Sequence, residues 1–315
     1  MRQRRGQERG EIDGSVRVLL IARSELTSWL LANISGIFAL MWKKAKRREQ
    51  KSGQIDRSVP SSAARTSFAL LAAYLLFALG YLAFSERLSA GDWRTASREP
   101  AGLAPDPSVT PEAVVQVYAA RAVGWRGYFG VHTWIAAKRT NAERFTVYEV
   151  IGYRLRRTGT SVVVHHRAPD GYWFGNRPEL LTDVRGAGVE EIIERIEAAV
   201  QTYPYADRYR VWPGPNSNTF TAFVLREVPE LRTDLPPTAI GKDFLGWSPV
   251  GKTPSGTGGQ LSLLGAVGVA AGVEEGVEIN VLGLTLGLDP RNLSLKLPLI
   301  GSVGFGGDVE PVRIE

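Results

Sequence analysis

The chain of 315 residues contains no cysteine, only two methionines and only three histidines. The absence of cysteine excludes disulfide bonds, thiolate metal ligands and a cysteine nucleophile. The histidines lack the spacing of a metal site, which needs three or four convergent ligands. The glycine-rich stretch 255–259 has no lysine and serine at the spacing that a phosphate-binding loop requires. We therefore predict no metal and no cofactor.

Positive charge is concentrated in the N-terminal part of the chain. Residues 1–65 hold 14 Lys and Arg against 6 Asp and Glu, whereas the rest of the chain holds 24 against 26. A nucleic-acid-binding protein needs a basic face on its folded domain. Because the remainder of this chain is close to neutral, we predict no nucleic-acid partner.

One apolar run is long enough to be a membrane anchor. Residues 67–84 carry no charge and would cross most of a hydrocarbon core as a helix. Eight basic residues between 43 and 65 precede the run, so the positive-inside rule places that side in the cytoplasm. We predict a single-pass protein of the inner (plasma) membrane, with the lipid bilayer as partner and a periplasmic or equivalent extracytoplasmic domain. The alternatives are a buried core helix and a cleaved signal peptide.

A second apolar run, residues 26–42, contains four Ser, Thr and Asn residues. It is either a second span or an interfacial helix. A start at Met41 would give the ordinary layout of an exported protein, so one hypothesis is that residues 1–40 are an over-extended gene start. The expected parts are a basic cytoplasmic segment (1–66), the anchor (67–84), a Gly- and Pro-rich linker (85–110), an α+β domain (111–250) and a Gly-rich β extension (251–315).

Periodicity predicts the elements of the α+β domain. A helix capped by Thr110 is expected through residues 113–120, and an amphipathic helix over 189–203. Alternating β-branched and aromatic residues predict strands at 128–136, 145–153 and 161–165. This order predicts an α+β fold in which helices pack on an antiparallel sheet. In the extension, the runs 261–271 and 277–288 flank a turn as in a hairpin, and residues 293–298 add a strand.

The turn at residues 212–218 leads into a helix expected over 219–227. Ser217 stands where the free N–H groups and the positive end of the helix dipole point. One interpretation is that Asn216, Ser217 or Asn218 is simply the N-cap. The other is that Ser217 is an activated nucleophile.

A serine nucleophile needs a histidine base, and His132 on a neighbouring predicted strand is the candidate. Glu149, His165 or His166 would orient its imidazole. Adjacent residues of a strand point to opposite faces, so at most one of His165 and His166 can join His132.

Four residues are candidates for ligand binding. The asparagines Asn216 and Asn218 flank the serine, and Trp134 and Trp212 would line an apolar groove for a lipid or a peptide. Core packing is the alternative for each tryptophan, as it is for Trp125 and Trp173.

Several words recur in the order of a known family. They are Tyr118-Ala-Ala-Arg, Val131-His-Thr-Trp-Ile, Trp173-Phe-Gly-Asn-Arg-Pro-Glu-Leu, Tyr203-Pro-Tyr-Ala, Pro213-Gly-Pro-Asn-Ser-Asn-Thr-Phe and Leu235-Pro-Pro-Thr-Ala-Ile-Gly-Lys-Asp. Residues 92–301 thereby resemble the uncharacterised bacterial family called domain of unknown function 3750. That resemblance implies no established activity.

A more distant likeness rests on His132-Thr-x-Ile in a strand and Asn216-x-Asn-x-Phe at a helix start. This pattern is similar to the circularly permuted papain-like hydrolases, namely the permuted NlpC/P60, lecithin:retinol acyltransferase-like and PPPDE proteins. The likeness implies a papain-like core with His132 as base, Ser217 in the place of the family's cysteine and Glu149 as the third polar residue. Serine is far less acidic than cysteine. Either Ser217 works with an oxyanion hole of backbone N–H groups, or the scaffold has lost catalysis and only binds.

We therefore expect a membrane-anchored hydrolase or acyltransferase, such as an amidase or peptidase, that acts on an amide or ester bond of an envelope peptide or lipid. The rival hypothesis is a non-catalytic envelope-binding domain on the same scaffold. A third is a structural membrane-assembly protein built on the Gly-rich tail, which would explain residues 255–305 but not the Ser217 turn.

Overall fold

The computed structural model describes residues 72, 74, 78, 80, 94–304 and 309–315. The expected cytoplasmic segment and the apolar run 26–42 lie outside these residues, as does most of the expected anchor 67–84. Among the residues that are described, no helix combines the length and the apolar character needed to cross a bilayer.

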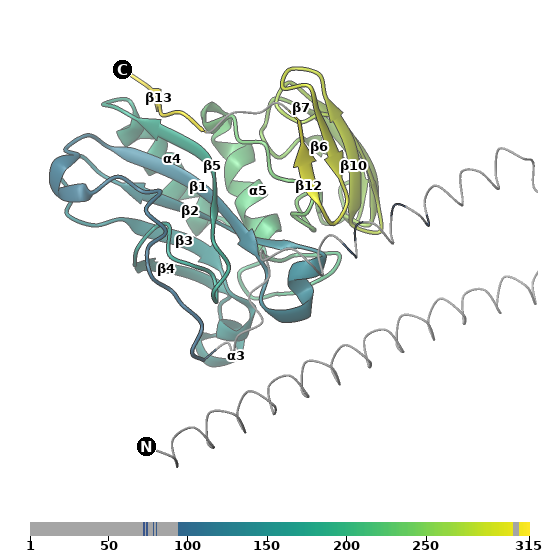
Figure 1. The fold of residues 1–315 in the computed structure, drawn as a ribbon, viewed down its shortest axis with the longest axis horizontal. Helices are drawn as coiled ribbons and strands as arrows, with labels where there is room; N and C mark the ends of the chain where they lie inside the picture. Colours follow the sequence, from purple (N-terminus) through teal and green to yellow (C-terminus); the bar gives the residue numbers. More distant parts are fainter. Residues whose placement is uncertain (1–71, 73, 75–77, 79, 81–93, 305–308) are drawn as a thin grey trace, which may run out of the picture. The chain divides into compact units, whose positions relative to one another are not determined.

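The first sheet has six strands in the order β13-β5-β1-β2-β3-β4 (Figure 1). Every pair is antiparallel except β13 with β5. The strands are β1 (Val114–Arg121), β2 (Val131–Lys138), β3 (Thr146–Val150), β4 (Val162–His166), β5 (Glu179–Arg185) and β13 (Val312–Arg313). Three of them, β2 to β4, overlap the strands expected from the sequence.

β1 occupies the segment for which a helix is predicted, and that prediction is wrong. Its residues 114–120 are all buried, because the strand lies between β5 and β2 and both faces of the sheet are covered. A strand buried on both faces has a nearly continuous apolar run instead of alternation, and such a run resembles a buried helix. The β-branched residues Val114, Val115 and Val117 are the local signal that favours a strand.

Two helices cover one face of this sheet. α4 (Val189–Gln201) and α5 (Ser217–Glu227) fall on the two helices expected in this region, and α5 begins two residues earlier than predicted. α5 packs on β2 and β3, and α4 packs on β1. Ile192, Ile193 and Ile196 of α4 form one core with Phe220 and Val224 of α5. The remaining helical elements of residues 94–304 and 309–315 are short: α3 (Leu155–Thr158), η1 (Pro107–Val109), η2 (Gly124–Tyr128), η3 (Gly152–Arg154) and η4 (Pro229–Leu231).

The opposite face of the sheet holds a second core around Tyr118 and Trp134, against which Leu103 and Trp173 pack. Leu103 belongs to the expected linker. The Leu103 N–H donates to Asp170 Oδ2 at 2.7 Å, and the Tyr172 N–H donates to the Glu99 carbonyl at 2.9 Å. The second half of the predicted linker is therefore part of the folded domain.

The Gly-rich extension forms a second sheet, a seven-stranded antiparallel meander in the order β12 to β6. Its strands are β6 (Val250–Lys252), β7 (Gly258–Leu263), β8 (Val267–Gly272), β9 (Gly276–Val281), β10 (Leu284–Asp289), β11 (Ser294–Leu297) and β12 (Gly301–Val303). Each run expected to be one strand of a hairpin holds parts of two strands. Leu282 and Gly283 join β9 to β10 with φ of 57° and 84°, the backbone of a two-residue turn that asparagine and glycine usually signal.

The second sheet buries polar side chains and exposes apolar ones. Along β9, Glu278 and Asn280 are buried, whereas Val277, Ile279 and Val281 are exposed. An antiparallel sheet with one solvated face normally has the reverse arrangement. The buried polar face therefore needs polar partners elsewhere in the chain.

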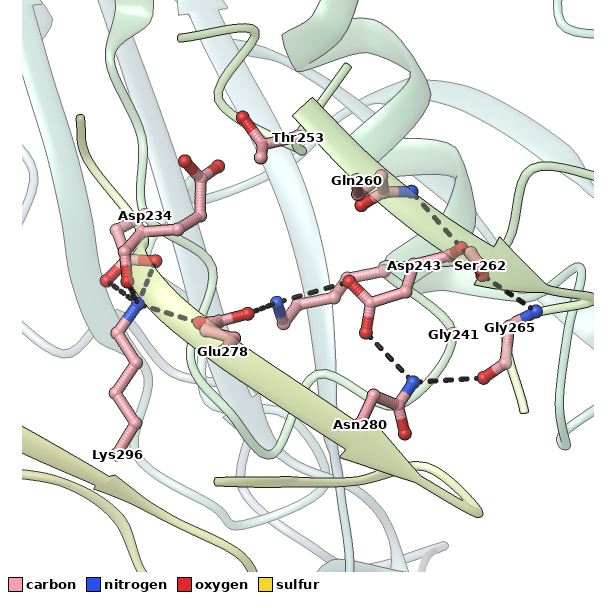
Figure 2. A network of polar contacts seen from close by, with 12 residues as sticks. Asp234, Gly241, Asp243, Thr253, Gln260, Ser262, Gly265, Glu278, Asn280 and Lys296 are labelled. Carbon is pink, nitrogen blue, oxygen red and sulfur yellow. Dashed lines mark hydrogen bonds and ion pairs between the residues drawn. The ribbon is translucent and has the colours of Figure 1, made fainter. Parts of the chain in front are cut away.

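Those partners come from residues 234–243, which precede the second sheet (Figure 2). Glu278 accepts hydrogen bonds from Lys242 Nζ and, at 2.7 Å, from Lys296 Nζ. Lys296 also donates to Asp234 at 2.7 Å, and Asn280 donates to Asp243 at 3.0 Å. Both lysines are buried. This buried ion network attaches the second sheet to the first domain.

The network makes the stability of the protein depend on pH through Asp234. Burial raises the pKa of Asp234 to about 7, although Lys296 acts in the opposite direction. Between the unfolded value of 3.8 and about 7, the folded chain holds a proton that the unfolded chain has lost, so stability falls as pH rises through this window.

Replacing Asp234 with asparagine removes this titration. We expect the free energy of unfolding of the variant, relative to that of wild type, to be higher at about pH 8 than at about pH 5 by on the order of 2 kcal/mol. Urea unfolding at both pH values measures the gain, with the exposed Asp207→Asn as the matched control. A difference between variant and wild type that is the same at both pH values would contradict the assignment.

Candidate functional site

Ser217 is the first residue of α5, and its neighbour Asn216 is the N-cap. The Asn216 side chain accepts hydrogen bonds from the N–H groups of Asn218 and Thr219 at 2.9 and 3.1 Å, and the Thr219 hydroxyl accepts one from the Asn216 N–H. This capping box uses the second and third free N–H groups of the helix. Ser217 is only 4% exposed.

The side chains of the two asparagines predicted to bind a ligand make hydrogen bonds within the protein. Asn216 Nδ2 donates to the carbonyls of Val211 and Ile240 at 3.0 and 2.9 Å. Asn218 Nδ2 donates to Val131 and Ile240, and Asn218 Oδ1 accepts from the Thr133 hydroxyl. Both side chains therefore hold the start of α5 in place, and their role in ligand binding stays a prediction.

His132 and Glu149 meet on the face of the first sheet that also holds Trp134. His132 Nε2 lies 2.8 Å from Glu149 Oε2, and His165 Nε2 lies 2.7 Å from Glu149 Oε1. Arg167 Nε donates to the same Oε1 at 3.3 Å. The three strands β2, β3 and β4 thus bring two imidazoles and one guanidinium to one carboxylate.

Of the histidine pair, His165 shares this cluster and His166 does not. His166 Nδ1 instead lies 3.2 Å from the Phe145 carbonyl oxygen. The strand pleat predicts that only one of the two can join His132. It could equally have identified Arg167, which follows His165 by two positions and which the sequence reading missed.

Aromatic rings surround His132. Trp173 stacks on the imidazole with ring centroids 3.7 Å apart and an angle of 10°, and Trp134 lies at 5.7 Å. Trp134 is fully buried and its Nε1 donates to the Pro169 carbonyl, so it belongs to the core and does not line the predicted groove. Trp212 is about half exposed, and its Nε1 donates to the Leu282 carbonyl at 3.0 Å.

The charges of the cluster follow from its contacts. Burial alone would raise the pKa of Glu149, but hydrogen bonds from His132 and His165 and the charge of Arg167 hold it well below its ordinary value. Burial lowers the pKa of His132 although Glu149 acts in the opposite direction. Near neutral pH, a neutral His132 therefore donates its Nε2 proton to an ionised Glu149. Its Nδ1 then carries the free lone pair, and this nitrogen has no hydrogen-bond partner within the described part of the chain.

Ser217 and His132 belong to neighbouring elements but are not hydrogen-bonded. Asn218 attaches the start of α5 to Val131 and Thr133, the residues on either side of His132 in β2. Among the described residues, no side chain makes a hydrogen bond with the Ser217 hydroxyl. The structure thus joins His132 to Glu149 on one face of the sheet and holds the start of α5 against the other face of β2, without closing a Ser–His hydrogen bond.

A separate open pocket of about 670 Å³ lies at one end of β3 and β4. Residues 100–107 form one wall, and Arg144, His166, Arg167 and Asp170 contribute to the rest. Arg167 is the only residue shared between this pocket and the cluster around Glu149. Within the described ranges, no group of acidic or histidine side chains has an arrangement that could hold a metal ion.

The contacts of His132, Glu149 and Ser217 lie within one segment that matches a family model. Residues 112–244 match the family model described as "Protein of unknown function (DUF3750)". The DUF3750 segment runs from just before β1 to Phe244 and contains all six of the words on which the resemblance was predicted. It supports that resemblance and ends before the second sheet. No curated protein and no solved structure matches the chain.

Proposed function

We propose that the DUF3750 segment is an acyl-transfer centre in a membrane-anchored, extracytoplasmic protein. Ser217 is the nucleophile, His132 is the general base and Glu149 is a positioning residue. The substrate is an amide or ester of an envelope peptide or lipid, and the product is either a hydrolysed acyl group or one transferred to another acceptor.

The single observation that carries the proposal is the 2.8 Å contact between His132 Nε2 and Glu149 Oε2. A buried carboxylate that accepts the Nε2 proton fixes the imidazole in the tautomer whose Nδ1 can accept a proton. Asn218 holds the first turn of α5, which begins with Ser217, against Val131 and Thr133 of β2, the two chain neighbours of His132. The imidazole points to the other face of the sheet, so Ser217 and His132 can meet only around the end of the sheet where β2 begins. Burial keeps His132 neutral near pH 7, because it lowers the pKa of the imidazole, and neutral is the form that a base requires.

The chemistry needs one proton acceptor and one nucleophile. Ser217 Oγ attacks the carbonyl carbon of the substrate while its proton passes to His132 Nδ1. The C–N or C–O bond breaks, and the leaving amine or alcohol takes that proton. Water or an acceptor amine or alcohol then attacks the acyl-serine while His132 accepts its proton. The bond between the acyl carbon and Ser217 Oγ breaks, and His132 returns the proton to Oγ. The N–H group of Ser217 is the donor that the capping box leaves for the oxyanion.

The test is reaction of the full-length protein with a fluorophosphonate probe. We expect labelling of wild type and of the exposed-loop variant Ser248→Ala, and no labelling of Ser217→Ala or His132→Ala. Because the pKa of His132 is lowered, labelling should persist as pH falls and be lost only below the ordinary histidine pKa of 6.5. Labelling that survives in Ser217→Ala would disprove the assignment of the nucleophile.

A second candidate is a non-catalytic envelope-binding domain on the same scaffold. Three observations favour it: Ser217 is almost fully buried, its hydroxyl makes no hydrogen bond with His132, and α5 and the His132 side chain lie on opposite faces of the first sheet. Wild-type protein that is folded yet does not react with the probe would support this candidate over the acyl-transfer centre.

A further inference from the structure

The outward face of the second sheet is apolar and uncharged. Every outward position on β7 to β11 is Gly, Ala, Val, Leu or Ile. Leu261, Val269, Ile279 and Leu288 stand on four successive strands and are each between 48% and 55% exposed. We call this surface the apolar sheet face.

The size of the apolar sheet face is that of an interaction site. Five strands spaced about 4.8 Å apart and about 20 Å long cover on the order of 400 Å² in projection. Monomeric soluble proteins rarely leave a larger continuous apolar patch uncovered, and patches of this size mark binding surfaces. The buried ion network fixes the orientation of the sheet, because Glu278 and Lys296 must stay on the inner side.

The chain itself indicates what covers this face. Leu284, which shares its row with Leu286 and Leu288 on β10, packs in a cluster with Ala78 and Leu299. The Tyr74 hydroxyl donates to the carbonyl oxygen of Pro298, in the loop after β11. Tyr74 and Ala78 belong to the apolar run 67–84, so one edge of the apolar sheet face contacts the predicted membrane anchor.

A tryptophan stands at the rim of the same face. Trp212 is half exposed and donates its Nε1–H to the carbonyl of Leu282, in the turn between β9 and β10. Tryptophan side chains prefer the boundary between lipid tails and water, where the ring is buried and the N–H is satisfied.

We propose that the apolar sheet face lies on the surface of a phospholipid bilayer, with its aliphatic side chains inserted at the boundary between headgroups and tails. This rests on residues 67–84 acting as the anchor and is independent of the acyl-transfer chemistry. The alternative occupant is a second copy of the chain, packed face to face. The bilayer is favoured because Tyr74 and Ala78 bring the predicted anchor to the edge of the face.

The lack of cysteine allows a direct test in the full-length protein. A single Ile279→Cys substitution is labelled with an environment-sensitive nitrobenzoxadiazole dye, and the protein is reconstituted in vesicles of phosphatidylethanolamine and phosphatidylglycerol. Leu286→Cys repeats the measurement on the neighbouring strand. The matched control is Val164→Cys on β4, an exposed valine of the first sheet. Circular dichroism confirms that each variant folds.

We expect the dye at residues 279 and 286 to emit at shorter wavelength than in water and to be quenched by nitroxide-labelled lipids. The dye at residue 164 should behave as in water. Water-like emission at all three positions would overturn the proposal. So would a shift at 279 without lipid quenching, accompanied by disulfide cross-linking between two unlabelled copies of the Ile279→Cys variant, because a second copy would then cover the face.

Discussion

Replacing Glu278 with alanine is expected to lower the free energy of unfolding by about 3–5 kcal/mol. The carboxylate of Glu278 is buried between two buried lysines, Lys242 and Lys296, and it accepts a hydrogen bond from each. Burial would raise the pKa of Glu278, but the two lysines hold it below its ordinary value. Removing it leaves two positive charges in the interior with only Asp234 and Asp243 to balance them.

Urea unfolding of the full chain in detergent, followed by tryptophan fluorescence, measures the loss. Glu191→Ala on the exposed face of α4 is the matched control, because surface substitutions usually change stability by less than about 0.5 kcal/mol. A loss for Glu278→Ala as small as that of the control would show that the lysines find other partners and that the network does not hold the second sheet.

Replacing Glu149 with glutamine is expected to lower the free energy of unfolding by about 3 kcal/mol near neutral pH and to abolish labelling by the fluorophosphonate probe. The carboxylate is buried, and it accepts hydrogen bonds from His132, His165 and Arg167. Glutamine keeps the shape but loses the charge, and its NH₂ group faces donors. His132 then loses the partner that fixes its tautomer.

The pH dependence of stability distinguishes the loss of the Glu149 charge from a loss of packing. The folded-state pKa of Glu149 lies below its unfolded value of 4.5, so its stabilisation is complete above that value. The stabilisation is lost as pH falls, because the unfolded chain takes up a proton that the folded chain refuses. The stability gap between wild type and Glu149→Gln should therefore narrow in acid. Glu194→Gln on α4 is the control, and a gap that stays constant with pH would contradict the role of the charge.

Much of the first domain follows from local sequence, and its exceptions have physical causes. The amphipathic pattern of α4 predicts its position because one face of that helix is buried and the other is solvated. The same approach fails for β1, whose burial on both faces depends on β5, which follows it by about sixty residues of chain. The local sequence around residues 113–120 does not show that this segment pairs with β5.

The second sheet could be predicted only in part. Its strands alternate as strands should, but the alternation alone does not say which face is inside. The inner face is polar because Lys242 and Asp243, in the loop before the sheet, pair with Glu278 and Asn280, and these pairs form only in the folded chain.

The candidate site, too, could be predicted from the sequence only in part. The spacing around His132 and Glu149 predicts two polar residues on neighbouring strands, and these two side chains are in contact. The roles of Asn216 and Asn218 could not be read from the sequence, because their partners Ile240, Val131 and Thr133 are brought to them by tertiary structure.

The buried ion network crosses the end of the family segment. Lys242 and Asp243 stand just before the last matched residue, Phe244, whereas Glu278 and Lys296 lie beyond it. The unit recognised by sequence similarity is therefore smaller than the unit that folds. A chain that ends after residue 250 would lack Glu278, which accepts a hydrogen bond from the Lys242 ammonium group in the intact protein. The glycine-rich tail therefore supplies the negative charge that Lys242, in the domain before it, requires.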